Sequence, residues 1–454
     1  QLAFISKEEK VNMVKIDNLS FKYDESDEKL FTTLSLEIED GDVVLLMASP
    51  GEGKTTLSRI ITGGCPKYTG GTISGEIDIS GKSILPLDTK ERIRLVGRVA
   101  QDTDEMILFS TVESELMFPL ENLGFSRDEI ETRISKSLET FELEKYRQVS
   151  TTELSGGEKR RLMCAILFAV DPFLYIFDES FDELSDRWRK KLASLIKERG
   201  RTTLVLASHP LAVYDGLYDK ALMLENGTVA NYEIKDLVLP PIDFNISNES
   251  IDVESLVVTR SHRSVFEESP FSLNVPSFSL KKGGLRLLMG ENGAGKSTFS
   301  RVMCGLLKED CGFVYINGKK TNEKDRRSKV AYLMQNPFEQ LFLPTVYDEM
   351  KSTGASDEDI ERALALFGIE RGMYISEISY GKAKMVQAAV FYLLDRDYVI
   401  LDELDSAIGY SDSWRAIKSF LDKGSGVLAI THDEYFASLL KAEITYIKDG
   451  MLCK

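Results

Sequence analysis

The chain reads Ala48-Ser49-Pro50-Gly51-Glu52-Gly53-Lys54-Thr55-Thr56 after an apolar run, Val43 to Met47, and at the start of an expected helix. Strand, glycine turn and helix in this order are typical of a phosphate site, because backbone N–H groups converge on the phosphate and the helix N-terminus adds its positive dipole. We predict that Lys54 neutralises the β- and γ-phosphates of a nucleotide and that Thr55 binds Mg²⁺. Ala48 replaces the usual first glycine, a mild change that binding should survive.

The same pattern occurs again in the second half of the chain. That copy reads Gly290-Glu291-Asn292-Gly293-Ala294-Gly295-Lys296-Ser297-Thr298. Its lysine and serine are expected to act like the lysine and threonine of the first copy, with Ser297 on Mg²⁺. Two matched loops in 454 residues predict a duplicated domain. The expected arrangement is a first domain over residues 1–235, a linker over 236–252 and a second domain over 253–454.

An apolar run ends in an Asp-Glu pair in each half, at Asp178-Glu179 and at Asp402-Glu403. Each run is long enough for one buried parallel strand, and ligands bind at the carboxyl ends of such strands. The first acid of each pair suits Mg²⁺ coordination through water. The second suits positioning and deprotonating the water that attacks the terminal phosphate. We therefore predict that Asp178 and Asp402 are metal-binding residues and that Glu179 and Glu403 are catalytic.

Two of the three histidines in the chain follow a further apolar run at equivalent positions of the two halves. These are His209 and His432, and their repetition favours a contact with the γ-phosphate that senses hydrolysis. The third, His262, has no counterpart and is assigned no role.

A serine with two glycines opens an expected helix in the first half, in Leu154-Ser155-Gly156-Gly157-Glu158. Such a helix start forms a second anion cradle. Because each half already has its own phosphate loop, we expect this cradle to act on nucleotide held by the other half. The second half reads Ile378-Ser379-Tyr380-Gly381-Lys382, so a large side chain stands where the backbone should approach phosphate closely. Ser379 and Gly381 remain candidates for the same contact.

The order of these features resembles that of tandem ABC-type ATPases, with glycine loop, glutamine segment, LSGG-type signature, Asp-Glu strand and histidine each present twice. The resemblance extends from about residue 13 to residue 454. It implies an α/β fold of two P-loop NTPase domains in tandem. Each would have a RecA-like, mainly parallel sheet core, an antiparallel β subdomain and a helical signature subdomain. The helical subdomains are expected at about residues 102–171 and 336–396.

The resemblance also implies further site residues, with ATP and Mg²⁺ as cofactors. Gln101 and Gln335 each follow an expected strand and would contact Mg²⁺ and the attacking water. Tyr23 would stack on adenine. The second half has only one candidate for that role, Phe266.

In this family two ATPase domains pair head to tail, so that each ATP site uses the glycine loop of one domain and the signature of the other. The Lys296 site, with Glu403, would then use the intact signature at Ser155. The Lys54 site would use the signature that contains Tyr380. We expect the Lys296 site to be the more active one within an intramolecular pseudo-dimer of the two domains.

The segment Gln335-Asn336-Pro337-Phe338-Glu339-Gln340-Leu341-Phe342 resembles the QNPxxQxF sequence of energy-coupling factor transporters and their cobalt- and vitamin-importing relatives. In that group the region receives coupling helices of a membrane partner. The resemblance implies an ATP-binding subunit with both ATPase halves fused, peripheral on the cytoplasmic face of the cell membrane. No apolar run approaches the roughly 20 residues that cross a bilayer. The importer would therefore need separate transmembrane subunits, one for coupling and one for substrate binding.

An alternative is a soluble tandem ABC ATPase that acts on ribosomes or nucleic acid. The net charge of −17 argues against a general nucleic-acid grip, which needs a basic face, and we expect no nucleic-acid partner. Ribosome-acting relatives typically carry a long charged helical linker or a basic arm. Here the join from Glu233 to Ile251 is short and contains Pro240-Pro241. The transported substrate stays open between a metal ion, a vitamin and a pyrimidine precursor.

Overall fold

The computed structural model describes residues 12–24, 26, 28–49, 51–103, 106–181, 184–208, 211–233, 239–261, 270–291 and 293–453. The chain divides into two compact units, residues 1–235 (unit 1) and 236–454 (unit 2). The predicted site residues Pro50, His209 and Asn292 lie outside the described residues, as do His262 and Phe266.

The core of unit 1 is a sheet with the strand order β10-β9-β3-β8-β7-β6. Its neighbours run parallel from β9 to β6, and β10 pairs antiparallel with β9. The strands are β3 (Val43–Met47), β6 (Val96–Val99), β7 (Leu174–Asp178), β8 (Thr202–Ala207), β9 (Lys220–Glu225) and β10 (Thr228–Asn231). Every residue of β3, β7 and β8 is buried, as expected for parallel strands covered on both faces.

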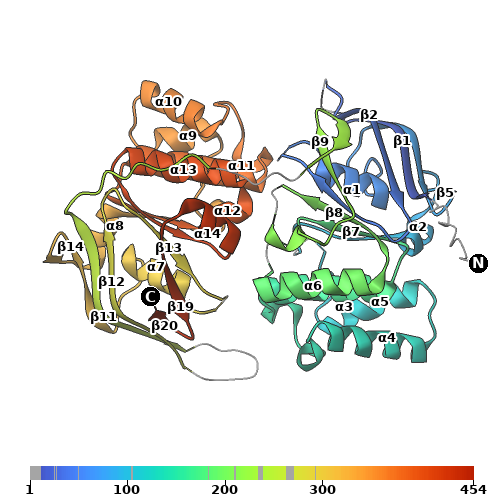
Figure 1. The fold of residues 1–454 in the computed structure, drawn as a ribbon, viewed down its shortest axis with the longest axis horizontal. Coiled ribbons are helices and arrows are strands. Elements are labelled where there is room, and N and C mark those ends of the chain that lie inside the picture. The colour runs from blue at the N-terminus through green and yellow to red at the C-terminus, as the bar shows by residue number, and fades with distance from the viewer. Residues whose placement is uncertain are drawn as a thin grey trace, which may run out of the picture. The chain divides into compact units, whose positions relative to one another are not determined.

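One face of this sheet packs against α1 and an antiparallel sheet of order β2-β1-β4-β5, and the other face packs against helices (Figure 1). Alternate residues of β7 divide between the two cores: Tyr175 and Phe177 belong to the helical side, Leu174 and Ile176 to the β side. The antiparallel strands are β1 (Asn12–Lys22), β2 (Phe31–Glu39), β4 (Thr72–Ile79) and β5 (Lys82–Ser83).

The helices of unit 1 divide between the two sides of the core sheet. The first two, α1 and α2, flank the phosphate loop and β6, while α3, α4 and α5 form the helical subdomain. They are α1 (Lys54–Thr62), α2 (Thr89–Leu95), α3 (Val112–Asn122), α4 (Arg127–Thr140), α5 (Gly156–Val170) and α6 (Asp186–Arg199), with short 3₁₀ turns η1 (Glu144–Tyr146), η2 (Thr151–Glu153) and η3 (Ala212–Tyr214).

Unit 2 repeats this design, with its antiparallel and parallel strands joined in one sheet of order β15-β14-β11-β12-β20-β19-β13-β18-β17-β16. The join is a single parallel pairing of Asn274 with Met451, between β12 and β20. The strands are β11 (Ser250–Ser261), β12 (Pro270–Lys281), β13 (Leu285–Met289), β14 (Cys311–Ile316), β15 (Lys319–Lys320), β16 (Val330–Leu333), β17 (Tyr398–Asp402), β18 (Gly426–Ile430), β19 (Glu443–Lys448) and β20 (Met451–Cys453).

The helices of unit 2 include a helical subdomain made of α9, α10 and α11, which pack on one another. The helices are α7 (Lys296–Met303), α8 (Glu323–Lys329), α9 (Val346–Lys351), α10 (Asp357–Phe367), α11 (Tyr380–Leu394), α12 (Leu404–Ala407), α13 (Tyr410–Asp422) and α14 (Glu434–Leu440), with 3₁₀ turns η4 (Pro337–Glu339) and η5 (Ile375–Glu377). Both units therefore confirm the predicted α/β class, in which each unit combines a mainly parallel core, antiparallel strands and a helical subdomain.

The helix that follows each signature begins at the predicted serine. Ser155 caps α5 in a capping box, because its hydroxyl accepts from the N–H of Glu158 while the Glu158 carboxylate accepts from the N–H of Ser155. Ser379 caps α11 in the same way, but Lys382 stands in the place of the glutamate and cannot accept a bond in return. Within the described residues, no helix is long and apolar enough to pass through a membrane.

Candidate active sites

The phosphate loop of unit 1 curls around its own lysine at the C-terminal end of β3. Gly51 and Gly53 have φ angles of +94° and +98°, which side chains rarely adopt. The buried ammonium of Lys54 donates to the carbonyl oxygens of Ala48 (2.6 Å) and Ser49 (3.3 Å). The loop thus places its lysine and the start of α1 at one point, as phosphate binding requires.

The loop of unit 2 has the same form, with Gly293 and Gly295 at positive φ and Lys296 bonded to the carbonyl oxygens of Gly290 (2.8 Å) and Glu291 (3.0 Å). Burial lowers the pKa of Lys296, against the opposite effect of the acids near it. The negative charge of a bound phosphate would stabilise the buried ammonium of Lys296.

The first position of the loop differs between the units for a structural reason. A Cβ atom on Gly290 would lie 2.2 Å from the carbonyl oxygen of Ile447, which is far too close. Ala48 is the equivalent residue in unit 1. It does not have a positive φ, its side chain is buried, and its N–H donates to the carbonyl of Ala207 at 3.0 Å. Alanine therefore fits in unit 1, where the sequence departs from the usual glycine.

Tyr23 lies beside the phosphate loop of unit 1. Its hydroxyl is 2.8 Å from the hydroxyl of Thr56, the second residue after the lysine, and its ring meets the edge of Phe21. Glu52, another predicted residue of the loop, accepts from the N–H of Asn226 at 2.8 Å. The expected stacking of Tyr23 on adenine stays a prediction.

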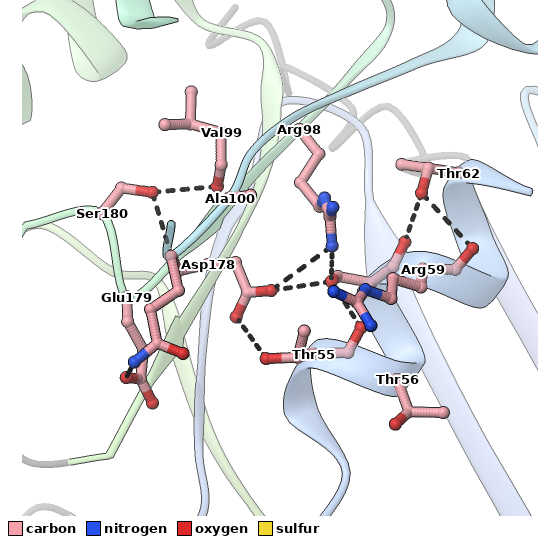
Figure 2. Close-up of polar contacts among 12 residues, drawn as sticks. Thr55, Thr56, Arg59, Thr62, Arg98, Val99, Ala100, Asp178, Glu179 and Ser180 are labelled. Carbon is pink, nitrogen blue, oxygen red and sulfur yellow. Dashed lines mark hydrogen bonds and ion pairs between the residues drawn. The ribbon is translucent and has the colours of Figure 1, made fainter. Parts of the chain in front are cut away.

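The predicted metal-binding aspartate of unit 1 lies at the end of β7, facing α1 (Figure 2). Asp178 is fully buried, and its carboxylate accepts from the hydroxyls of Ser58 (2.8 Å) and Thr55 (3.4 Å). The guanidinium of Arg98, on β6, lies 3.7 Å from the same carboxylate and donates to Ser58. Burial raises the pKa of Asp178, and the bonds from Ser58 and Arg98 oppose this rise.

The equivalent aspartate of unit 2 has different neighbours. Asp402 accepts a bond of 2.5 Å from the phenol of Tyr332, on β16, beside Ser297. Its backbone carbonyl accepts from the buried ammonium of Lys384 at 3.1 Å. Burial raises the pKa of Asp402 and lowers that of Lys384 to about 8. The sequence therefore places the two aspartates correctly but does not reveal the groups that hold them.

The predicted catalytic glutamates both adopt the left-handed backbone conformation, with φ of 49° at Glu179 and at Glu403. In each unit the glutamine identified from the sequence donates to this glutamate. Gln101 Nε2 lies 2.7 Å from Glu179 Oε2, and Gln335 Nε2 lies 2.7 Å from Glu403 Oε2. The structure thus brings together the glutamine and glutamate of each half, and their expected role in positioning one water stays a prediction.

The second oxygen of each glutamate has a different partner in the two units. In unit 1, Glu179 Oε1 lies 3.3 Å from the ammonium of Lys54 and accepts from the hydroxyl of Ser208, which the sequence analysis missed. In unit 2, Glu403 Oε1 lies 2.9 Å from Nε2 of His432. Burial would raise the pKa of Glu403, but the contact with His432 and the nearby lysines outweigh it and the pKa falls.

The donor set fits Mg²⁺ bound with ATP. Among the described residues no three His, Cys, Asp or Glu side chains gather as a metal cluster. Mg²⁺ does not need one, because it takes one or two protein ligands and completes its shell with phosphate and water. The oxygens of Thr55 and Asp178 meet next to Lys54, which supplies this combination in unit 1.

Comparison with known proteins extends over both units. A family model described as "ABC transporter" matches residues 31–182 and 273–406. A "Putative ABC transporter ATP-binding protein" of Treponema denticola is 28% identical over 97% of this chain and 96% of its own length. A "Putative HMP/thiamine import ATP-binding protein" of Bacillus subtilis is 26% identical over 96% of this chain and 90% of its own length.

A solved structure with the same arrangement of elements is that of an archaeal ribosome recycling factor in complex with a ribosomal stalk protein. It is 19% identical, with a TM-score of 0.64, over 96% of this chain and 89% of that chain. At this identity the likeness concerns the fold alone.

Proposed function

Since the chain belongs to the ABC transporter family and is an ATP-binding and hydrolysing ATPase, we propose that it powers a membrane importer of the energy-coupling factor type. It would work at the cytoplasmic face of the membrane, on separate coupling and substrate-binding subunits. The observation that carries this proposal is an exposed apolar surface at the segment that follows each glutamine.

Two apolar side chains dominate that surface. In unit 2, Phe342 is 79% exposed, and in unit 1 the side chain of Leu108 is 72% exposed. Contiguous exposed apolar patches mark interaction sites, and Phe338 and Leu343 of the same segment of unit 2 are exposed as well. In both units a buried carboxylate holds the backbone of this segment. The buried carboxylate of Glu349 accepts from the N–H groups of Phe342 and Leu343, and that of Glu115 accepts from the same positions in unit 1.

This internal support distinguishes the surface from a loose loop. A buried carboxylate that binds two N–H groups holds the segment in one conformation before any partner arrives, which lowers the entropic cost of docking. Burial raises the pKa of Glu115, against the two backbone bonds. A coupling helix of a membrane subunit is a partner of the expected size and polarity for such an apolar surface.

The alternative, action on ribosomes, has less support. The ribosome recycling factor resembles this chain in fold only, whereas the relative from Bacillus subtilis is named for import and matches across nearly its whole length. The net charge of −17 also opposes a broad contact with RNA.

The test is to purify the tagged full-length chain from its source cells and to ask where it sediments. We expect polytopic membrane proteins to accompany it after detergent extraction. Phe342→Ser should release it from the membrane fraction, whereas Leu306→Ser, at an exposed leucine elsewhere in unit 2, should not. Co-sedimentation with ribosomes that depends on ATP, with no membrane association, would support the alternative.

The residues of the Lys296 site have distinct roles in the proposed hydrolysis. Lys296 neutralises the β- and γ-phosphates, and Glu403 removes a proton from the attacking water. Gln335 contacts one carboxylate oxygen of Glu403 and His432 contacts the other. These two contacts orient the carboxylate before ATP binds. Mg²⁺, held through Ser297 and Asp402, would supply charge neutralisation at the phosphates.

The two sites are proposed to differ in rate. In a head-to-tail pairing the Lys296 site would use the intact signature at Ser155, and the Lys54 site would use the one that contains Tyr380. A helix N-terminus with glycine at its first position leaves room for phosphate, while a tyrosine there does not. The Lys296 site is therefore the faster one.

A further inference from the structure

The signature helix of each unit holds the carbonyl oxygen of the glutamine that contacts the catalytic glutamate. In unit 1 this is done by Arg160, the fifth residue after Ser155, which is fully buried. One end of its guanidinium donates to the carbonyl of Gln101 at 2.5 Å, and the other donates to the carbonyl of Ala100. A single forked side chain therefore holds two successive carbonyls.

Unit 2 has a lysine at the equivalent position, and a lysine does not have that fork. Lys384, the fifth residue after Ser379, donates to the carbonyl of Met334 at 2.7 Å, the counterpart of Ala100. It also donates to the carbonyl of Asp402. The carbonyl of Gln335 accepts instead from the hydroxyl of Tyr380, at 2.6 Å.

We propose that Tyr380 is a positioning residue that replaces the second arm of the arginine. Lys384 bonds the carbonyls of Met334 and Asp402, and the Tyr380 hydroxyl supplies the bond to the Gln335 carbonyl. That bond keeps Gln335 against Glu403. Tyr380 and Lys384 of unit 2 therefore replace Gly156 and Arg160 of unit 1 as a pair. The ring of Phe338 lies 6.4 Å from that of Tyr380 and helps to fix it.

This assignment deepens the proposed function, since the value of holding Gln335 rests on Glu403 acting as the catalytic base. It also changes the meaning of the altered signature. The tyrosine that weakens one ATP site in trans supports the catalytic glutamine of its own unit. Restoring the usual glycine, by Tyr380→Gly, should therefore loosen the Gln335 segment.

This pairing of Tyr380 with Lys384 is tested by amide hydrogen exchange on the whole protein without nucleotide. Tyr380→Phe keeps the ring and removes the hydroxyl. We expect exchange in peptides that cover residues 334–343 to rise about threefold to tenfold, as the loss of one hydrogen bond implies. Lys384→Arg added to Tyr380→Phe should return it to within about twofold of the starting rate. Tyr374→Phe, at an exposed tyrosine of the same unit, should have no effect.

The reverse substitutions in unit 1 are an independent check if arginine does not fit at position 384. Arg160→Lys should raise exchange in peptides that cover residues 96–103, and Gly156→Tyr should lower it again. A Cβ at Gly156 meets no atom within 4 Å, so the tyrosine has space. Unchanged exchange in Tyr380→Phe, or no rescue in either unit, would overturn the proposal.

The ATPase rate separates this inference from the proposed function. If exchange rises in Tyr380→Phe and the rate falls several-fold with it, both stand. If exchange rises and the rate does not change, Tyr380 holds the segment as inferred, but the Gln335–Glu403 contact is not what limits hydrolysis.

Discussion

Arg98 and Tyr332 stand at the same position of the two units, three residues before the glutamine, and each holds the aspartate of the neighbouring strand. Arg98 lies 3.7 Å from Asp178 as a cation, whereas Tyr332 donates a neutral hydrogen bond of 2.5 Å to Asp402. Both contacts cross from one parallel strand to the next. The two carboxylates proposed to bind metal are therefore held by different chemistry, and the units should respond differently to equivalent substitutions.

Ser58→Ala should destabilise unit 1 more than Ser300→Ala destabilises unit 2. The Ser58 hydroxyl bonds both Asp178 and Arg98. The equivalent hydroxyl of Ser300, also four residues after its lysine, bonds the Lys296 carbonyl of its own helix. We expect a loss of about 2 kcal/mol for Ser58→Ala and below about 1 kcal/mol for Ser300→Ala. Each unit has one tryptophan, Trp188 or Trp414, so urea unfolding can be followed by fluorescence after the other is changed to Phe. Equal losses would contradict the prediction.

Glu403→Gln should reduce ATP hydrolysis by about 100-fold or more, because it would remove the proposed general base of the site proposed to be faster. Glu179→Gln should reduce it by less than about threefold. Steady-state rates are to be measured with the membrane partners present, and ATP binding in parallel shows that each variant still loads nucleotide. Similar losses in the two variants would show that the sites are equivalent.

Gly290→Ala should disrupt the phosphate loop of unit 2, whereas Ala48→Gly should be tolerated in unit 1. The new methyl group would overlap the carbonyl of Ile447, 2.2 Å away, while Ala48 is already accommodated. We expect ATP to bind at least tenfold more weakly at the altered loop, and Ala48→Gly to cost about 1 kcal/mol of folding free energy at most. Titration with a fluorescent ATP analogue is the measurement. An unchanged affinity in Gly290→Ala would refute the geometry.

Asp405→Asn should change how the stability of unit 2 depends on pH. Burial raises the pKa of Asp405 from 3.8 to about 7, although Thr431 donates a hydrogen bond of 2.6 Å to it. The protonated carboxyl therefore contributes stability that is complete below pH 3.8 and is lost as the pH rises through about 7. The wild type should lose stability relative to Asp405→Asn between pH 4 and 7, by at most about 1.4 kcal/mol per pH unit.

The measurement is urea unfolding followed by Trp414 fluorescence at a series of pH values. Asp422→Asn, at an exposed aspartate of the same unit, is the control and should give a constant difference. A constant difference for Asp405→Asn as well would show that this carboxyl is not neutral in the folded protein.

The family resemblance indicated the two glutamines, and local spacing was enough to predict the phosphate loops and the buried strands that end in Asp-Glu. It was not enough for Arg98 and Tyr332, because these contacts depend on the register between β6 and β7 and between β16 and β17. The pairing of parallel strands separated by a whole helical subdomain leaves no pattern in one sequence.

Tyr380 shows a second limit. In the sequence it is a departure from the signature, and steric reasoning predicts only an obstruction. Its hydrogen bond to Gln335 becomes visible once α11 and the glutamine segment are side by side. Buried Lys384 carries the missing signal, since a lysine inside an apolar helix face requires acceptors that the sequence does not locate.

The left-handed backbone at Glu179 and Glu403 sets stability against activity. A non-glycine residue in this conformation stores free energy that the surrounding fold must offset. Replacing either glutamate with asparagine or glycine would remove the carboxylate and relax the backbone in one step. The variants at Glu403 should fold at least as well as the parent while hydrolysing slowly. This makes them suited to trapping the ATP-loaded form, and it means that selection for stability alone would erase the catalytic residue.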